Sequence, residues 1–183
     1  MTNPEQENWW VLRAQSGDLE ALNELLKAVQ GPLYRYIYSL VGQQHLAEDI
    51  LQEVFIRIHR KLGWLREPKL FRPWAFRVAT NETFRRLKQE RRWSDQVRDE
   101  DALKAIPAPP PREEFAPEVV ERLPRLLDNL SPGSRAVIVL YYLHEMSLEE
   151  VAAVLAIPLG TVKSRLSYGL ESLRRQLHGT VFI

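Results

Sequence analysis

The sequence has 183 residues, of which 45% are hydrophobic and 27% are charged, and it contains no cysteine. This composition supports hydrophobic cores in one or two small domains, and the lack of cysteine excludes disulfide scaffolds, thiol nucleophiles and zinc fingers. The longest apolar run, residues 136–143, is eight residues long, whereas a membrane-spanning helix needs roughly 20. The first ten residues carry Glu5 and Glu7 and do not resemble a secretory signal. We therefore expect a cytoplasmic protein with no membrane insertion.

The net charge of +1 hides a strong segregation of charge along the chain. Residues 54–98 hold 13 Lys and Arg against 4 Asp and Glu, whereas residues 1–53 hold 3 against 8. Residues 99–117 hold 2 against 5, and residues 118–183 hold 7 against 7. A basic segment between acidic ones is typical of a protein that binds nucleic acid. A solvated helix face explains the same charges equally well.

Helical signals dominate, because apolar residues recur three and four positions apart and glycine is rare inside these segments. We predict an all-α protein with two small helical domains, residues 5–95 and 118–179. Residues 96–117 form the predicted linker, because the five prolines between residues 106 and 117 favour an extended, semi-rigid spacer.

The first amphipathic segment covers residues 45–57 and continues to Ile58. Its apolar residues are spaced to face a core, and they are Ile50, Leu51, Val54 and Ile58. The opposite face carries Glu48, Asp49, Gln52 and Glu53. This acidic face suits a basic partner surface, although a solvated face is the simpler interpretation.

A second amphipathic helix follows over residues 73–92, with Pro73 in its first turn. One face carries Phe76, Thr80, Thr83 and Leu87, and the other carries Trp74, Asn81, Arg85, Lys88 and Arg92. A basic stripe with a neutral amide near its start can follow phosphates and touch a base. We interpret Trp74 as a core residue in preference to a stacking residue.

The C-terminal third contains three helical signals. Residues 136–143 have the composition of a buried strand, but they follow Ser131 and Pro132, a pair typical of a helix start, so we predict a buried helix. Residues 147–150 read Ser-Leu-Glu-Glu, which predicts a capping box and a new helix. Residues 157–160 read Ile-Pro-Leu-Gly, and we expect Gly160 to permit a sharp turn into a further helix from about Thr161.

That last helix has two different faces. The apolar stripe consists of Val162, Leu166, Leu170, Leu173 and Leu177. Opposite it lie Thr161, Ser164, Tyr168, Glu171 and Arg175, flanked by Arg165 and Ser172. A short helix, a tight turn and a second helix with polar side chains on its exposed half are what a major-groove reader requires. A plain helical hairpin with a hydrated face is the alternative.

Residues 160–166, Gly-Thr-Val-Lys-Ser-Arg-Leu, together with Ser-Leu-Glu-Glu-Val-Ala at 147–152, resemble the fourth conserved region of bacterial sigma factors, especially the extracytoplasmic-function (ECF) group. In that family the second helix reads the promoter's minus-35 element. The resemblance implies DNA contacts by Thr161, Lys163, Ser164, Arg165, Ser167 and Tyr168. The family favours Arg where Tyr168 stands and Ala where Gly169 stands, and a glycine inside a helix costs roughly 1 kcal/mol relative to alanine.

Residues 45–57 resemble the sigma-factor helix that binds the clamp coiled coil of the RNA polymerase β′ subunit. This resemblance implies that core polymerase is bound by Asp49, Gln52, Glu53 and Phe55. Residues 73–92 resemble the helix that contacts the minus-10 element, and residues 63–69 correspond to the loop that captures an extruded base. The implied contacts are Trp64, Leu65, Arg66, Asn81, Arg85 and Lys88. The family often has Asp where Arg85 stands, so this helix is more basic than usual.

The leading hypothesis is an ECF-type sigma factor whose first domain is region 2 and whose second is the region 4 helix-turn-helix. Its implied partners are core RNA polymerase, through the β′ clamp coiled coil and the β flap, promoter DNA and an anti-sigma factor. We expect no catalysis, metal or cofactor. A stand-alone helix-turn-helix regulator is one alternative, although we find no dimerisation or effector domain. A nuclease or recombinase is another, but no close metal-ligand spacing relates His45, His59, His144 and His178.

Overall fold

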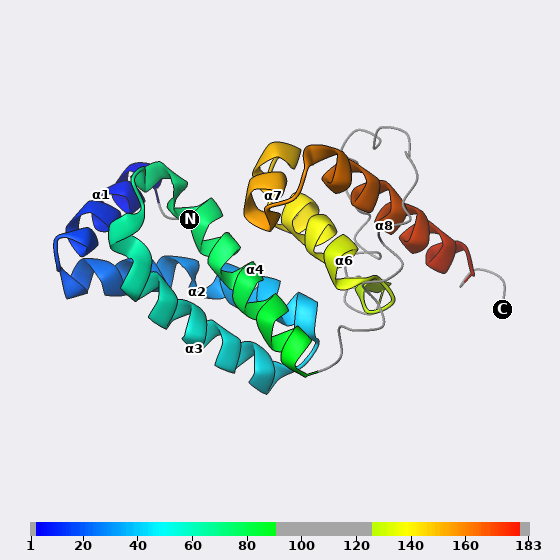
Figure 1. The fold of residues 1–183 in the computed structure, drawn as a ribbon, viewed down its shortest axis with the longest axis horizontal. Helices are drawn as coiled ribbons and strands as arrows, with labels where there is room; N and C mark the ends of the chain where they lie inside the picture. Colours follow the sequence, from blue (N-terminus) through cyan, green and yellow to red (C-terminus); the bar gives the residue numbers. More distant parts are fainter. Residues whose placement is uncertain (1–2, 91–125, 180–183) are drawn as a thin grey trace. The chain divides into compact units, whose positions relative to one another are not determined.

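A computed structural model describes residues 3–90 and 126–179 of the chain. Every regular element within these two ranges is helical, which confirms the predicted all-α class (Figure 1). The chain divides into two compact units, Met1–Arg86 and Leu87–Ile183. The predicted linker, residues 96–117, lies outside the described residues, as do the boundaries predicted at residues 95 and 118.

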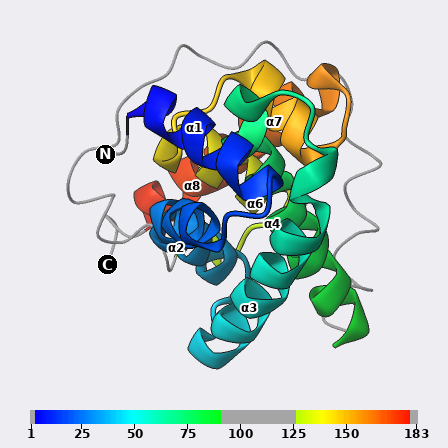
Figure 2. The same ribbon diagram turned by 90° about the vertical axis from the view of Figure 1, so that its left-hand side faces the viewer.

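Four α-helices and two short 3-10 turns build the first unit (Figure 2). They are α1 (Pro4–Gln15), α2 (Leu19–Val41), α3 (Gln44–Lys61), η1 (Leu62–Trp64), η2 (Pro68–Leu70) and α4 (Phe71–Gln89). Asp18 begins α2 by accepting a hydrogen bond of 3.0 Å from the Ala21 amide, which satisfies one of the unpaired N–H groups of a helix start. Gly42 ends α2 in the left-handed conformation, with φ 69°. The long helix α2 packs against both α1 and α3.

The core of the first unit is formed by the predicted apolar faces. Ile50, Leu51, Val54 and Ile58 are buried in it, and so are Phe76, Thr80 and Thr83. Leu87, the first residue of the second unit, is buried as well, so both predicted faces are confirmed. Tyr36 lies fully buried in this core, where its hydroxyl hydrogen-bonds that of Thr80 at 2.8 Å. Burial raises the pKa of Tyr36, because the phenolate would lose its hydration. The Tyr36 ring also meets Phe76 edge-on at 5.4 Å, so α2 is held against α4.

Trp74 occupies an intermediate position on α4. Its side chain is half-buried, and its ring centroid lies 6.2 Å from that of Phe71. Trp74 therefore packs against a fully buried phenylalanine at the start of α4, but it is not itself a buried core residue as the sequence analysis predicted.

The second unit contains α6 (Pro132–Ile138), the π-helical segment η4 (Val139–Leu143), α7 (Leu148–Leu155) and α8 (Leu159–Gly179). Residues 136–143 are therefore helical, as predicted. The predicted capping box is also present, because the Glu150 amide donates to Ser147 Oγ at 3.1 Å and the Ser147 amide donates to the Glu150 carboxylate at 2.8 Å. The stripe on α8 faces the core, with Leu177 half-buried and the other four members buried.

The turn between α7 and α8 differs from the prediction. Ala156, with φ 54° and ψ 43°, adopts the left-handed conformation that ends α7. Gly160 instead lies within the first turn of α8, so the prediction that it makes the sharp turn was wrong. An alanine in this conformation costs about 1–2 kcal/mol, which the packing of the two helices must offset. The turn between the two helices is therefore made at Ala156, before Pro158, and not at Gly160.

Gly169 is the point of close approach between α6 and α8. A Cβ atom built on Gly169 would lie 2.5 Å from Ile138 Cδ1 and 3.3 Å from Ile138 Cγ1. Ile138 is fully buried on α6, so its side chain has little freedom to move aside. Gly169 lowers helix propensity, but the absence of a side chain there permits the close packing of α6 and α8.

We expect Gly169→Ala to destabilise the protein by about 1 kcal/mol, because overpacking outweighs the gain in helix propensity. Ile138→Val alone should cost about 1 kcal/mol. The destabilisation of the double variant should be smaller than the sum of the two single destabilisations, since valine lacks the Cδ1 atom that the new Cβ meets. Urea unfolding followed by circular dichroism measures all three. A stabilised Gly169→Ala protein would contradict the close-packing explanation.

Candidate nucleic-acid and polymerase interface

The polar face of α3 carries the residues predicted to bind core polymerase. Asp49 and Gln52 are exposed, whereas Glu53 and Phe55 are half-buried. A hollow of about 450 Å³ lies along the same helix and is lined by Glu53, Ile56, Arg57, Arg60 and Lys61. Ile56, an apolar side chain, is 50% exposed there. An exposed apolar residue within a charged rim is the composition that a protein partner can cover.

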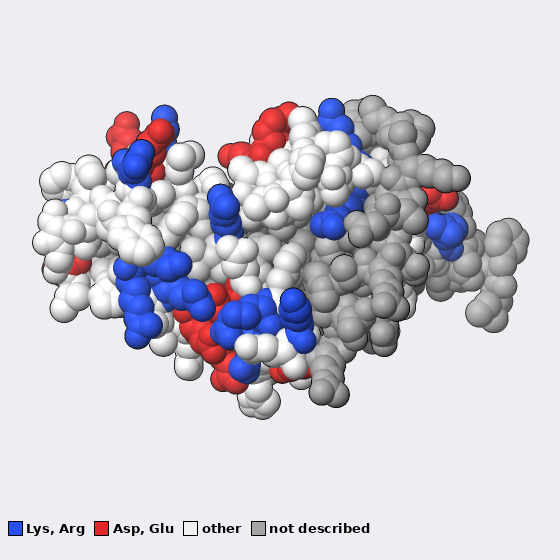
Figure 3. Space-filling model, viewed as in Figure 1, with Lys and Arg blue, Asp and Glu red and all other residues white. Residues whose placement is uncertain are grey.

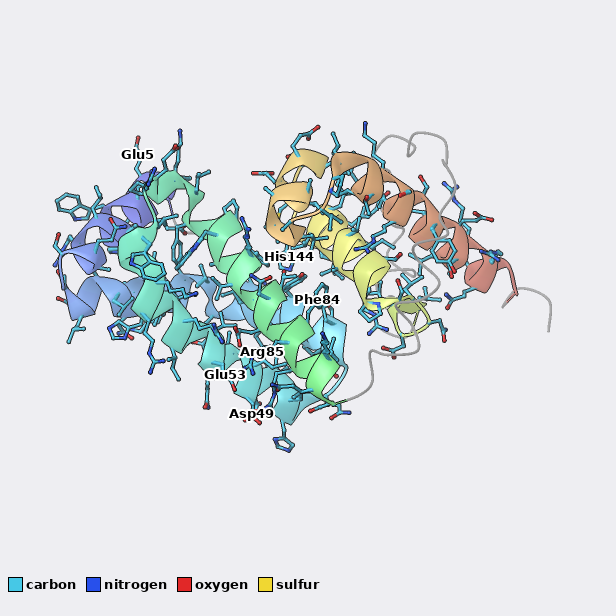
Figure 4. All side chains as sticks on the ribbon, viewed as in Figure 1. Glu5, Asp49, Glu53, Phe84, Arg85 and His144 are labelled. Carbon is cyan, nitrogen blue, oxygen red and sulfur yellow. The ribbon has the colours of Figure 1, made fainter. Side chains whose placement is uncertain are left out.

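A buried carboxylate joins α3 to α4. Glu82 of α4 is only 3% exposed, and it forms ion pairs with Arg57 of α3 and Arg85 of α4. Arg85 Nε donates to Glu82 at 2.9 Å, and Arg85 Nη2 also contacts Glu53 of α3. Figure 4 shows Arg85 pointing from α4 toward Glu53. The four side chains form a continuous ion-pair network, which we call the Glu82 network.

The charges of this network act on Arg85. Its hydrogen bond to Glu82, followed by the charge of Glu82 and the contact with Glu53, raises the pKa of Arg85. Nearby, Arg86 Nη2 lies 4.0 Å from the Asp49 carboxylate. Acidic and basic side chains consequently alternate over α3 and α4 (Figure 3). The predicted polymerase-binding and DNA-binding residues therefore meet at one contact, that of Glu53 with Arg85.

Sequence reasoning did not single out Glu82. The only local signal was an acidic residue within an otherwise basic helix, and periodicity places it beside the buried Thr83 without indicating a partner. Its importance comes from Arg57, which lies on another helix 25 positions earlier in the chain.

The remaining predicted minus-10 residues divide between α4 and the segment that precedes it. On α4, Asn81 and Lys88 are exposed and Arg85 is half-buried. Residues 62–66, which we call the η1 loop, carry Trp64, Leu65 and Arg66. Trp64 is 77% exposed, and Lys61 Nζ lies 5.8 Å from its ring centroid, a cation–π distance.

A second hollow adjoins the η1 loop. Its volume is about 330 Å³, and its lining consists of Asn8, Arg66, Glu67, Pro68 and Lys69. An exposed aromatic ring beside polar and charged groups can stack an unpaired base and hydrogen-bond its edge. Asn8 belongs to α1, a helix that the sequence analysis left without a role.

All six predicted minus-35 residues lie on α8, which follows α7 after the tight turn at Ala156. Tyr168 is exposed, and the other five are half-buried: Thr161, Lys163, Ser164, Arg165 and Ser167. Ser164 Oγ donates to the Gly160 and Thr161 carbonyls, each at 3.1 Å. Its proton is therefore used within the helix, and toward DNA the hydroxyl can act as a hydrogen-bond acceptor.

No cluster of three or more potential metal-ligating side chains occurs in residues 3–90 and 126–179. None of the helices described there is both long enough and apolar enough to cross a membrane.

Comparison with known proteins identifies the family. The model of sigma-70 region 2 matches residues 25–93, and that of sigma-70 region 4 matches residues 126–175. The chain is 30% identical to the ECF RNA polymerase sigma factor SigW of Bacillus subtilis, over 91% of this chain and 94% of SigW. The chain belongs to the ECF sigma factors. It therefore functions in transcription initiation, and its α7–α8 pair is the DNA-binding helix-turn-helix of region 4.

Solved structures share the fold of this sigma factor. CnrH in complex with the cytosolic domain of CnrY matches with a TM-score of 0.70 and 24% identity, over 95% of this chain and 98% of CnrH. RpoE in complex with the anti-sigma factor NepR from Bartonella quintana matches with a TM-score of 0.66 and 23% identity, over 85% of this chain and 96% of RpoE. The region 2 match in this sigma factor begins at residue 25, so it leaves out α1.

We expect Glu82→Gln to lower the free energy of unfolding by about 2 kcal/mol, because Arg57 and Arg85 lose a buried charged partner. The value is below that of a fully buried pair, since both arginines are partly exposed. Glu24→Gln is the matched control. Glu24 pairs with Lys27 at 2.8 Å on the surface, and its loss should cost under about 0.5 kcal/mol. Equal losses in chemical unfolding of the two variants would argue against the role given to Glu82.

Proposed function

We propose that this sigma factor acts in the cytoplasm, where it binds core RNA polymerase through the exposed face of α3 and the clamp coiled coil of β′. It reads the minus-35 element with α8, in a second unit held by the β flap. It reads the minus-10 element with α4 and the η1 loop, and it helps to melt that element. Bond formation belongs to the polymerase.

The exposed face of α3 is the observation that carries this proposal. Asp49 and Gln52 project from a helix whose opposite face, formed by Ile50, Leu51, Val54 and Ile58, is buried in the core. Beside them the hollow along α3 exposes Ile56 between charged side chains. A stand-alone DNA-binding regulator has no need of such a surface, whereas a polymerase subunit does.

The η1 loop and α4 together supply what melting of the minus-10 element requires. Asn81 and Lys88 are exposed on α4 and can contact bases and phosphates. Trp64 offers an exposed ring to an unstacked base, and stacking of that kind is worth about 1–3 kcal/mol. Melting therefore draws on binding energy for the separated strand and needs no catalytic group.

The exposed side of α8 supports the proposed minus-35 recognition. Lys163 and Arg165 supply charge for phosphates and guanine edges, and Tyr168 supplies a hydroxyl on the exposed face. Because Tyr168 has no fixed charge, it can discriminate between bases without adding to sequence-independent attraction.

We also propose an anti-sigma factor as a partner. The support is the likeness in fold to RpoE, which was solved with the anti-sigma factor NepR. An inhibitor that covers the α3 face would prevent the binding of core polymerase, and co-purification from native cells tests for it.

We expect the double variant Asp49→Ala/Gln52→Ala to bind core polymerase at least about tenfold more weakly, because both side chains lie on the proposed interface. Glu24→Ala removes a half-buried acidic residue of α2 whose side chain reaches the surface, and this matched control should bind normally. Affinity is measured by fluorescence anisotropy with labelled sigma factor, and specific initiation is measured on a genomic fragment library. Specific DNA binding by the wild-type protein without any binding to core polymerase would instead favour the stand-alone regulator.

We expect Lys163→Ala to weaken the binding of holoenzyme to all promoter sequences alike. The slope of log affinity against log salt concentration should fall by the amount that about one phosphate contact contributes. Tyr168→Ala should instead change the preference among minus-35 sequences. Arg175→Ala serves as the control, because Arg175 lies seven residues beyond Tyr168 on α8 and pairs with Glu171 at 3.9 Å. Unchanged affinity, salt slope and sequence preference in the first two variants would remove α8 from the proposed interface.

A further inference from the structure

The N-terminal helix α1 lies before the region 2 match, yet it is firmly attached to the unit that contains region 2. Glu7 of α1 is buried and accepts hydrogen bonds from Arg72 Nε at 3.1 and 2.9 Å, with Arg72 Nη2 at 2.8 Å. An arginine that meets a carboxylate through two nitrogens fixes orientation as well as distance. This pair holds α1 against the start of α4, which Arg72 occupies.

One side chain of α1 reaches the η1 loop directly. Gln15 Nε2 donates to the carbonyl of Leu62 at 2.9 Å and to that of Leu65 at 2.7 Å. The same two residues close the turn, because the Leu65 amide donates to the Leu62 carbonyl at 3.0 Å. Both N–H groups of the Gln15 amide are therefore engaged with the two ends of the turn that contains Trp64.

The position of Gln15 is itself fixed by the corner between α1 and α2. Gln15 is the last residue of α1, and Gly17, with φ 94°, takes a left-handed conformation that only glycine adopts readily. Asp18 caps α2 and also accepts from Arg13 Nε at 2.7 Å, so the two helices are tied together across the corner. The backbone that carries the Gln15 side chain is thus already ordered.

Trp64 has few contacts of its own to hold it. Because its side chain is 77% exposed, the direction of its ring depends mainly on the backbone of the η1 loop, together with Lys61 beside the ring. A recognition group that is already in position avoids the entropic cost of being ordered at the moment of binding. The two hydrogen bonds from Gln15 supply that order.

We propose that Gln15 is a positioning residue for promoter opening, which fixes the η1 loop so that Trp64 meets the extruded base of the minus-10 element. This inference rests on the proposed function. It gives α1, which lies outside the region 2 match, a role in capturing the separated strand. That role is carried by the side-chain amide of Gln15. Gln15 touches no DNA itself and acts through the Leu62 and Leu65 carbonyls.

The experiment uses holoenzyme formed from core polymerase and the full chain, on a promoter with a fluorescent base analogue in the minus-10 non-template strand. Gln15→Leu keeps the bulk of the side chain and removes both donors, whereas Gln15→Glu keeps its shape and turns oxygens toward the two carbonyls. We expect both variants to open the promoter about fivefold to tenfold more slowly. Their affinity for core polymerase should be unchanged. Gln6→Leu, at an exposed position of the same helix, should behave as the wild type.

A Trp64→Ala background separates positioning from a general effect on stability. If Gln15 acts through Trp64, Gln15→Leu should slow opening by less than about twofold in that background. An equal effect in both backgrounds, or wild-type opening by both Gln15 variants, would overturn the inference while the proposed function stands. If the wild-type holoenzyme opens no promoter from the fragment library, the proposed function fails, and this inference fails with it.

Discussion

The carboxylate of Glu82 is the constraint on which the arrangement of α3 and α4 depends. A charge that is almost fully removed from water is costly unless it is paired and hydrogen-bonded. Arg57 approaches it from α3 and Arg85 from its own helix, so the carboxylate is satisfied only when the two helices lie in one register. The exposed faces of α3 and α4, which we propose for polymerase and for the minus-10 element, are thereby fixed relative to each other.

Arg85 links the two proposed surfaces, that for core polymerase on α3 and that for the minus-10 element on α4, so a change at one can affect the other. It contacts both Glu82 and Glu53, but Glu53 is far more exposed than Glu82. Exposed ion pairs are weak and screened by salt, so the contact with Glu53 is the one that a phosphate or a polymerase side chain can replace. The pairing with Glu82 can persist through such an exchange. The helix register is therefore kept while the surface contact changes.

Features that depend on local spacing could be predicted from the sequence, and features that depend on distant partners could not. Periodicity identified the buried faces of α3, α4 and α8, and the Ser147 capping box needed only a spacing of three residues. The turn before α8 was placed at Gly160, whereas Ala156 takes the left-handed conformation, which alanine rarely adopts and which no local pattern predicts. Helix propensity alone makes Gly169 unfavourable, and only its close approach to Ile138 on another helix explains the glycine. The contact from Gln15 to Leu62 joins residues 47 positions apart, which no periodicity indicates.

Two separate contacts hold the two parts of the proposed minus-10 surface. The Glu82 network fixes α4, and with it the exposed Asn81, against α3. The amide of Gln15 fixes the η1 loop, and with it Trp64, against α1. Within the network, salt screens the exposed contact of Arg85 with Glu53 more strongly than the pairing with the buried Glu82, and it acts least on the hydrogen bonds of Gln15, which join neutral groups. Rising ionic strength should therefore weaken the contact of Arg85 with Glu53 first, while α4 and the η1 loop keep their positions.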